Sequence, residues 1–254
     1  MRFATLGSGS RGNALLVEGG GTRLLVDCGF GLRELERRLR RLGAGPGDID
    51  AILVTHEHSD HVRGVAALSR RYRIPVWGSP GTWIRVGAQG PETLRLFSGH
   101  AAAGFRVGAI RARPFPVPHD AREPCQFLLE CGGRKLGTLT DAGSVTPHVR
   151  GLLSECDALV LECNHDVGML RRGPYPRALQ DRIAGAFGHL SNRQAAELLD
   201  ALPHGRLTGI LVAHLSEKNN CPDLARRTLL EVDVDLQDRL ILAQQDRPSP
   251  WLEV

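Results

Sequence analysis

Four side chains of metal-binding type stand within six residues of each other, directly after an apolar segment. The apolar segment Ala51–Val54 has the length of a strand, and His56, His58, Asp60 and His61 follow it. Alternate side chains of an extended chain share a face, so His56 and His58 both point toward one ion. Asp60 and His61 fall at the turn into a following helix, where they can serve a second ion. This spacing predicts two adjacent metals; chance clustering or packing of histidines in a core is the alternative.

Three further candidates occur in the same local context, a buried strand followed by His or Asp. His119, Asp141 and His214 each follow an apolar segment of strand length. Because such strand ends can share one rim of a sheet, we expect these residues to join the first cluster. Taken singly, a His or Asp after a strand is more often a cap, a turn residue or a surface residue. Together they complete two coordination shells.

Two adjacent ions define the chemistry. About 3.5 to 4 Å apart, they lower the pKa of a bridging water, hold the scissile group and neutralise the charge that develops on attack. The predicted nucleophile is therefore a hydroxide that bridges the metals. Shells rich in histidine suit zinc, while a shared carboxylate also suits manganese or iron. We expect two divalent ions, zinc or manganese, with iron as a further possibility.

Hydrolysis of a phosphodiester also requires a proton for the leaving alkoxide. His189 is the candidate acid, because it stands just before a predicted helix, Ser191–Leu202. Its alternative role is that of a helix cap. For His165, a role beside the metal ligands, a contact with substrate and a place in the core remain open.

The elements that must position these residues alternate between strand and helix. The predicted strands are Arg2–Leu6, Ala14–Val17, Thr22–Val26, Ala51–Val54, Ile74–Trp77, Ile110–Phe115, Gln126–Glu130, Lys135–Thr140, Ala158–Glu162 and Ile210–Ala213. The predicted helices are Leu32–Leu42, Val62–Ser69, Arg193–Leu202 and Leu224–Leu230. Residues 80–106 are weakly patterned, with a short helix near Trp83 and strand pieces at Leu94–Phe97.

The composition is that of an ordinary globular chain. Of 254 residues, 42% are hydrophobic and 24% charged, which excludes disorder, collagen and coiled coil. No apolar run reaches the ~18 residues of a membrane span, and the N-terminus turns into a Gly/Ser loop before a secretion signal could form. We therefore expect a cytoplasmic protein. Six cysteines without a CxxC pair predict free, mostly buried thiols.

The basic residues are almost all arginine, Lys135 and Lys218 being the exceptions. A net charge of +4 is too small to show whether they meet phosphate. Two clusters, at 33–41 and 63–73, are expected as solvated helix faces, and within them Arg38, Arg41, Arg63 and Arg71 are the candidates for contact with a phosphate backbone.

The motifs together resemble a known family. The HxHxDH run, His119, Asp141 within Thr140–Gly143, and His214 resemble the five metal motifs of the metallo-β-lactamase fold. More narrowly, the segments Gly7–Asn13, Pro118–Ala121, Glu162–Asp166, Gly188–Asn192 and His214–Asn220 resemble the YycJ/WalJ group. The likeness covers nearly the whole chain and implies an αββα four-layer sandwich of the α/β (α+β) class, with residues 1–254 as a single domain.

The resemblance also implies roles. It assigns the first metal to His56, His58 and His119, the second to Asp60, His61 and His214, and the bridge to Asp141. His189 resembles the catalytic, non-ligand histidine of ribonuclease Z, and Asp60 counts as catalytic as well as ligating. Asp27 resembles the buried aspartate that steadies the histidine loop. Further residues are expected beside the ligands or near the substrate, namely Ser8, Ser10, Asn13, His165 and Asn220.

The leading hypothesis is a metal-dependent phosphodiesterase that acts on nucleic acid, most similar to a DNA exonuclease. A histidine at position 58, where flavodiiron proteins have Glu, disfavours redox chemistry. The chain also has no room for the insert of β-CASP nucleases and shows no long arm like that of ribonuclease Z. A hydrolase of small esters, thioesters, lactones or β-lactams is the alternative enzyme, and a metal-binding regulatory protein without catalysis is the third hypothesis. No membrane partner is expected.

Overall fold

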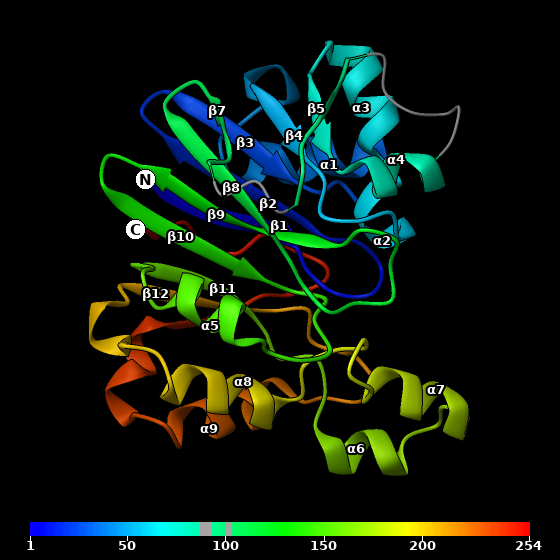
Figure 1. The fold of residues 1–254 in the computed structure, drawn as a ribbon, viewed down its shortest axis with the longest axis vertical. Coiled ribbons are helices and arrows are strands. Elements are labelled where there is room, and N and C mark those ends of the chain that lie inside the picture. Colours follow the sequence, from blue (N-terminus) through cyan, green and yellow to red (C-terminus); the bar gives the residue numbers. More distant parts are fainter. Residues whose placement is uncertain (87–92, 100–102) are drawn as a thin grey trace.

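Two β-sheets face each other, and helices cover the outer face of each (Figure 1). The computed structural model describes residues 1–86, 93–99 and 103–254. Within them, the first sheet has the order β14 (Leu252–Glu253), β1 (Arg2–Gly7), β2 (Ala14–Gly19), β3 (Thr22–Val26), β4 (Ala51–Leu53), β5 (Val76–Gly78) and β6 (Leu94–Leu96). The second has the order β13 (Leu240–Leu242), β12 (Gly209–Ala213), β11 (Ala158–Glu162), β10 (Arg134–Leu139), β9 (Cys125–Cys131), β8 (Ile110–Pro116) and β7 (Phe105–Val107).

The two sheets and the helices on their outer faces make four layers, and an apolar layer lies between each neighbouring pair. Phe3 and Phe127 belong to the layer between the sheets. A second layer joins the first sheet to its helices, and a third joins the other sheet to α5 (Pro147–Leu153), α8 (Asn192–Asp200) and α9 (Pro222–Leu230). This arrangement confirms the predicted αββα sandwich.

The first outer helix buries leucines at the spacing that the sequence predicted. In α1 (Leu32–Arg41), Leu35 and Leu39 lie one turn apart and are fully buried. Arg38 was expected on the solvated face, and this is wrong: it is buried, and its guanidinium donates to the backbone oxygens of Leu6 and Gln245. Arg38 therefore has no surface for a phosphate.

The prediction of a single helix over Val62–Ser69 was also wrong. The structure has two helices, α2 (Ser59–Val62) and α3 (Val65–Tyr72), separated at Gly64. The Gly64 amide donates to the oxygen of Cys28 at 2.8 Å, and a Cβ on Gly64 would lie 2.1 Å from the oxygen of Phe30. This close approach of two backbones ends α2 and turns the chain.

Several short elements were not predicted. These are α5, α6 (Val167–Arg172), α7 (Arg177–Ile183), β7, β13 and β14. Near Trp83, where a short helix was expected, α4 spans Pro80–Val86, and β6 lies within the expected strand region. The rest of that region includes residues 87–92 and 100–102, which lie outside the described residues.

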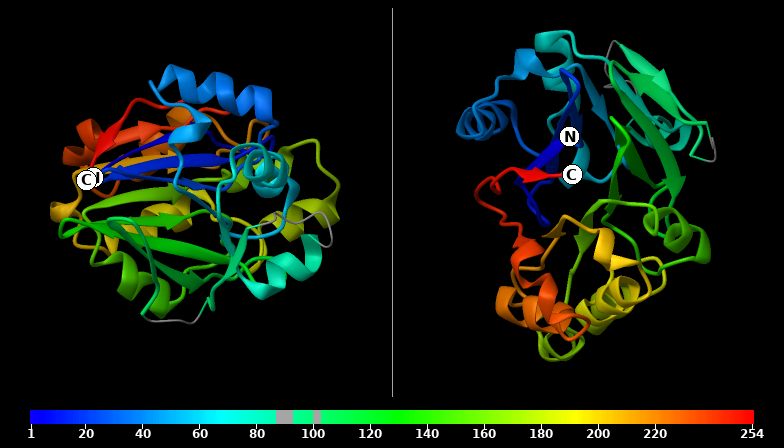
Figure 2. Two further views of the ribbon diagram at one scale, coloured as in Figure 1. Left: turned by 90° about the horizontal axis from the view of Figure 1, so that it is seen from above. Right: turned by 90° about the vertical axis from the view of Figure 1, so that its left-hand side faces the viewer.

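The two ends of the chain meet at one edge of the first sheet. β14 pairs with β1, and the Val254 amide donates to the oxygen of Met1 at 2.9 Å. Figure 2 shows the termini side by side in both views. In the described ranges, no helix has the length and apolarity of a membrane span. The six cysteines are free, four of them buried.

Parallel pairing aligns the strands that carry the chemistry. β3 pairs with β4, and β11 pairs with both β10 and β12, in parallel. The carboxyl ends of neighbouring parallel strands lie at the same edge of a sheet. Asp27, His56, Asp141 and His214 follow these ends, and Glu162 is the last residue of β11.

Candidate metal centre

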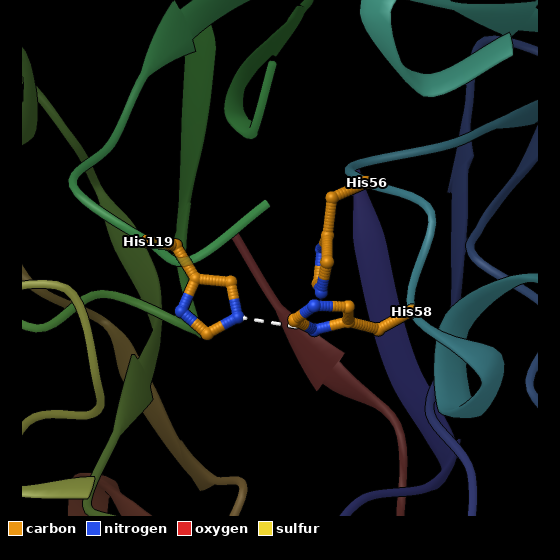
Figure 3. Close-up of side chains that lie close together, drawn as sticks. All are labelled: His56, His58 and His119. Carbon is orange, nitrogen blue, oxygen red and sulfur yellow. Dashed lines mark hydrogen bonds between the residues drawn. The ribbon is translucent and has the colours of Figure 1, made fainter. Parts of the chain in front are cut away.

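Three histidines from two loops form the first group of candidate ligands. His56 and His58 follow β4, and His119 follows β8. Each offers a nitrogen that lies within 4.8 Å of the others. The rings converge in Figure 3, where His119 Nε2 lies 3.3 Å from His58 Nδ1. The structure thus brings together the three residues expected at the first metal.

Asp60, His61 and His214 form a second group beside the first. The Asp60 carboxylate lies 3.4 Å from His61 Nε2 and 3.7 Å from His214 Nε2. Asp141 lies between the groups, with one oxygen 3.4 Å from His61 Nε2 and the other 3.6 Å from His214 Nε2. Asp141 also forms a compact set with His56 and His61.

The ring orientations leave one nitrogen of each buried histidine for a ligand. Nδ1 of His61 donates to Asp27, Nδ1 of His119 to the oxygen of Gly188, and Nδ1 of His214 to Glu162. Nδ1 of His56 is 2.9 Å from the Thr55 hydroxyl. A proton held at Nδ1 leaves the lone pair of Nε2 available, as in metal sites where an outer residue orients the ring.

Buried polar atoms without partners test whether a cation fits. His56 Nε2, His214 Nε2 and Asp141 Oδ2 are buried and have no hydrogen-bond partner. Buried polar groups are nearly always satisfied, so such a cluster requires an additional group. Histidine nitrogens and carboxylate oxygens are the donor set of zinc, manganese and iron. The residues therefore fit divalent cations.

The electrostatics of the site agree with this fit. Burial lowers the pKa of His56 well below its ordinary value, which leaves the ring neutral. Burial alone would raise the pKa of Asp60, but His61 and His214 outweigh it, and the net pKa is lowered. Burial alone would lower the pKa of His61 and His214, but the Asp141 carboxylate and its neighbours outweigh it, and the pKa of His214 is raised to about 10. The carboxylates thus favour positive charge at these two rings, and a bound cation would take the place of their extra protons.

The backbone is strained at three positions of this site. Asp27, Asp141 and His214 have φ values of 62°, 54° and 54°. Side chains with a Cβ rarely adopt this left-handed conformation, which costs about 1–3 kcal/mol and is concentrated at functional sites. This conformation turns the chain sharply where each strand ends.

The residues expected beside the ligands divide into two sets. Asp27 accepts hydrogen bonds from His61 and from the amide and hydroxyl of Thr55. Ser8 accepts from the His214 amide, and Asn13 donates to Asp60 at 3.2 Å. These three residues hold ligands or their loops, while Ser10 lines the pocket in front of them.

The second set lies farther from the ligands. Asn220 donates to the oxygen of Cys163 and pairs with Asn192, so it joins two loops without lining the pocket. His165 is buried, and its Nδ1 has no hydrogen-bond partner. Burial lowers the pKa of His165 to about 4, so the ring is neutral.

Glu162 is a central residue of the site to which the sequence analysis gave no role. It is fully buried at the end of β11, and its Oε1 accepts from Nδ1 of His189 at 2.8 Å and of His214 at 3.0 Å. Its Oε2 accepts from the amides of Ala142 and Leu190. Its role could have been inferred from the sequence, because a glutamate at the end of an otherwise apolar strand is unusual.

His189 lies beside the candidate ligands and is not the cap of the following helix. Ser191 caps α8, and its hydroxyl accepts from the Gln194 amide. Burial alone would lower the pKa of His189, but the Glu162 carboxylate outweighs it and raises the pKa above its ordinary value. The Glu162 carboxylate therefore favours the protonated form of His189.

A pocket of about 250 Å³ opens onto both groups. His58, Asp60, Asp141, His189 and His214 form one part of its lining. Residues before and within α7, which the sequence analysis did not anticipate, form another part. Arg182 of α7 donates to Asp120 at 2.5 Å. Arg41, Arg63 and Arg71 are exposed but do not line this pocket.

Comparisons with known proteins agree on one family. A family model described as a beta-lactamase superfamily domain matches residues 22–210. The chain is 36% identical to an exodeoxyribonuclease YycJ of Bacillus anthracis, over 91% of this chain and 89% of that protein. It is 34% identical to an exodeoxyribonuclease WalJ of Streptococcus pneumoniae, over 100% of this chain and 98% of that protein.

A solved structure has the same fold. The metallo-beta-lactamase fold protein YhfI from Bacillus subtilis superposes with a TM-score of 0.73, at 16% identity and over 98% of both chains.

Proposed function

Since the chain belongs to the metallo-β-lactamase superfamily of hydrolases and to its YycJ/WalJ group, we propose that it hydrolyses phosphodiester bonds of nucleic acid as a DNA exonuclease. One observation carries the choice of a phosphodiester. His189 lies in the pocket of the candidate ligands, belongs to neither of the two groups proposed to hold the ions, and donates to the buried Glu162. The alkoxide that leaves in phosphodiester hydrolysis requires such a proton donor.

The proposed centre contains two divalent ions. His56, His58 and His119 would hold one, Asp60, His61 and His214 the other, and Asp141 both. When bound, such ions activate water as a nucleophile and stabilise the charge that develops on a phosphodiester. Because the ligands come from both sheets, we also infer that residues 1–254 act as one domain.

The remaining chemistry belongs to the protein's own side chains. Asp27 and Glu162 fix the rings of His61 and His214, so the ligands need no reorganisation during the reaction. The Glu162 carboxylate keeps a proton on Nδ1 of His189 and favours its charged form. His189 would then donate from Nε2 to the leaving oxygen, a step worth about 10²–10⁴-fold in rate.

The test is digestion of end-labelled single-stranded DNA, double-stranded DNA and RNA with added manganese or zinc. We expect metal-dependent shortening of DNA that His58→Ala abolishes and His189→Ala slows by about 10²–10⁴-fold. His148→Ala is the matched control, because His148 is exposed on α5, away from the ligands. A parallel panel contains a lactone, a thioester and a β-lactam. Turnover confined to that panel would contradict the proposal.

A further inference from the structure

We propose that the wall of the pocket formed by Tyr175 and α7 is a binding site for one unpaired nucleotide at the end of a DNA strand. The Tyr175 ring is the platform on which the terminal base stacks. This inference rests on the proposed nuclease function and specifies which form of DNA end the site accepts.

The composition of this wall suits a nucleobase. Tyr175, Leu179 and Ile183 line the same pocket as His58 and His189. Leu179 and Ile183 are one helical turn apart in α7, so their side chains share a face. An aromatic ring beside two aliphatic side chains offers a flat, apolar surface that every base can cover, without selection for sequence.

The wall is held in place before any ligand arrives. The buried Gln180 side chain donates to the oxygen of Tyr175 at 2.9 Å, and proline stands on either side of Tyr175. Arg182 ties α7 to Asp120, and the oxygen of Ile183 accepts from the His189 amide at 2.9 Å. The platform is therefore connected directly to the residues that carry the chemistry.

Positive charge accompanies the apolar wall. The Lys218 ammonium lies 5.6 Å from the centre of the Tyr175 ring. Lys218 is exposed, and it belongs to the loop that follows His214. A strand whose terminal base stacks on Tyr175 would bring its phosphates close to this cation. An uncharged apolar substrate would make no electrostatic interaction with Lys218.

The size of the pocket favours an unpaired nucleotide. Its volume of about 250 Å³ is just below the ~300–1,000 Å³ typical of small-ligand pockets. It has room for one nucleotide and not for a base pair, so a paired terminal base must leave its partner to enter. Single-stranded and frayed ends should therefore react faster than blunt duplex ends.

The test is a thermodynamic cycle measured by binding, without turnover. Single-stranded DNA with an internal dye is titrated with the protein in EDTA, and its affinity is read from fluorescence anisotropy. The DNA carries either a normal nucleotide or an abasic residue at one end, and the two ends are tested separately. Loss of stacking should weaken binding of the wild type by about 5- to 150-fold at one end.

The variants decide the outcome. In Tyr175→Ala the same abasic residue should cost less than about two-fold, because the platform is already missing. Tyr175→Phe keeps the ring and should behave like the wild type. Phe187→Ala removes an aromatic ring that is exposed nearby but does not line the pocket, and it should also behave like the wild type.

Two results would overturn the inference. One is an equal abasic penalty in Tyr175→Ala and the wild type, and the other is no penalty at either end of the wild type. Digestion of DNA by the metal-loaded wild type is scored separately. If DNA is digested but the cycle shows no coupling, only the stacking site fails; if DNA is not digested, the nuclease function fails.

Discussion

Replacement of Glu162 by glutamine tests whether this buried carboxylate organises the site. The carboxylate accepts four hydrogen bonds, from the side chains of His189 and His214 at Oε1 and from the amides of Ala142 and Leu190 at Oε2. An amide has the same shape but only one accepting oxygen. Whichever way the glutamine amide turns, its NH₂ group faces two atoms that donate hydrogen bonds to the carboxylate in the wild type.

The magnitude follows from the orientation of the amide. If NH₂ faces the two backbone amides, two buried donors lose their acceptor, at about 1–3 kcal/mol each, and the free energy of unfolding falls by about 2–6 kcal/mol. If NH₂ faces the histidines, each must accept at Nδ1 and carry its proton on Nε2. His214 then has no lone pair for a metal, and the ion that it is proposed to hold should be lost.

Two measurements cover both cases. Urea unfolding in EDTA reports the stability, and elemental analysis after dialysis reports the metal content. Glu197→Gln, an exposed change on α8, is the matched control and should stay within about 0.5 kcal/mol of the wild type with full metal content. The reasoning is refuted if Glu162→Gln also keeps both its stability and its metal.

Four further outcomes are expected. Because burial lowers the pKa of His165 to about 4, the unfolded chain binds a proton there that the fold does not, and this contribution to stability is lost as the pH falls from about 6.5 to about 4. In urea titrations in EDTA, the free energy of unfolding of His165→Gln should fall by about 3 kcal/mol less than that of the wild type over this pH range. If both proteins lose the same stability, His165 does not have the lowered pKa. Gly29→Ala would place a Cβ 1.7 Å from the oxygen of Asp60 and should destabilise the protein by about 1–3 kcal/mol or more, whereas Gly31→Ala, with no atom within 4 Å, should not. Asp27→Asn should weaken metal binding by about 10–100-fold in competition with a chromophoric chelator, and equal affinity would exclude its role in orienting His61. Removal of metal by EDTA should lower the melting temperature of the wild type, since an ion at 100 times its Kd adds about 2.7 kcal/mol of stability; an unchanged melting curve would mean that no ion is bound to the native state.

Local patterns in the sequence predict much of the fold and the candidate ligands. The leucines of α1 repeat at helical spacing, and the apolar segments before His56, Asp141 and His214 have strand length. These patterns can be recognised in the sequence alone, because each depends on residues a few positions apart. The short helices α6 and α7 have six and seven residues, too few for such a repeat to stand out. The backbone contact at Gly64 that separates α2 from α3 leaves no trace in the hydrophobic pattern.

Only the tertiary structure decides which distant residues meet at the rim. Glu162 contacts His189 and His214, which are 27 and 52 residues away, and Arg182 reaches Asp120 across 62 residues. These contacts depend on the parallel register of β10, β11 and β12 and on the close packing of two sheets. The sequence by itself determined the side chains that can bind metal and the strands that carry them. The geometry between those strands arises from pairing and packing, which bring together residues that are far apart along the chain.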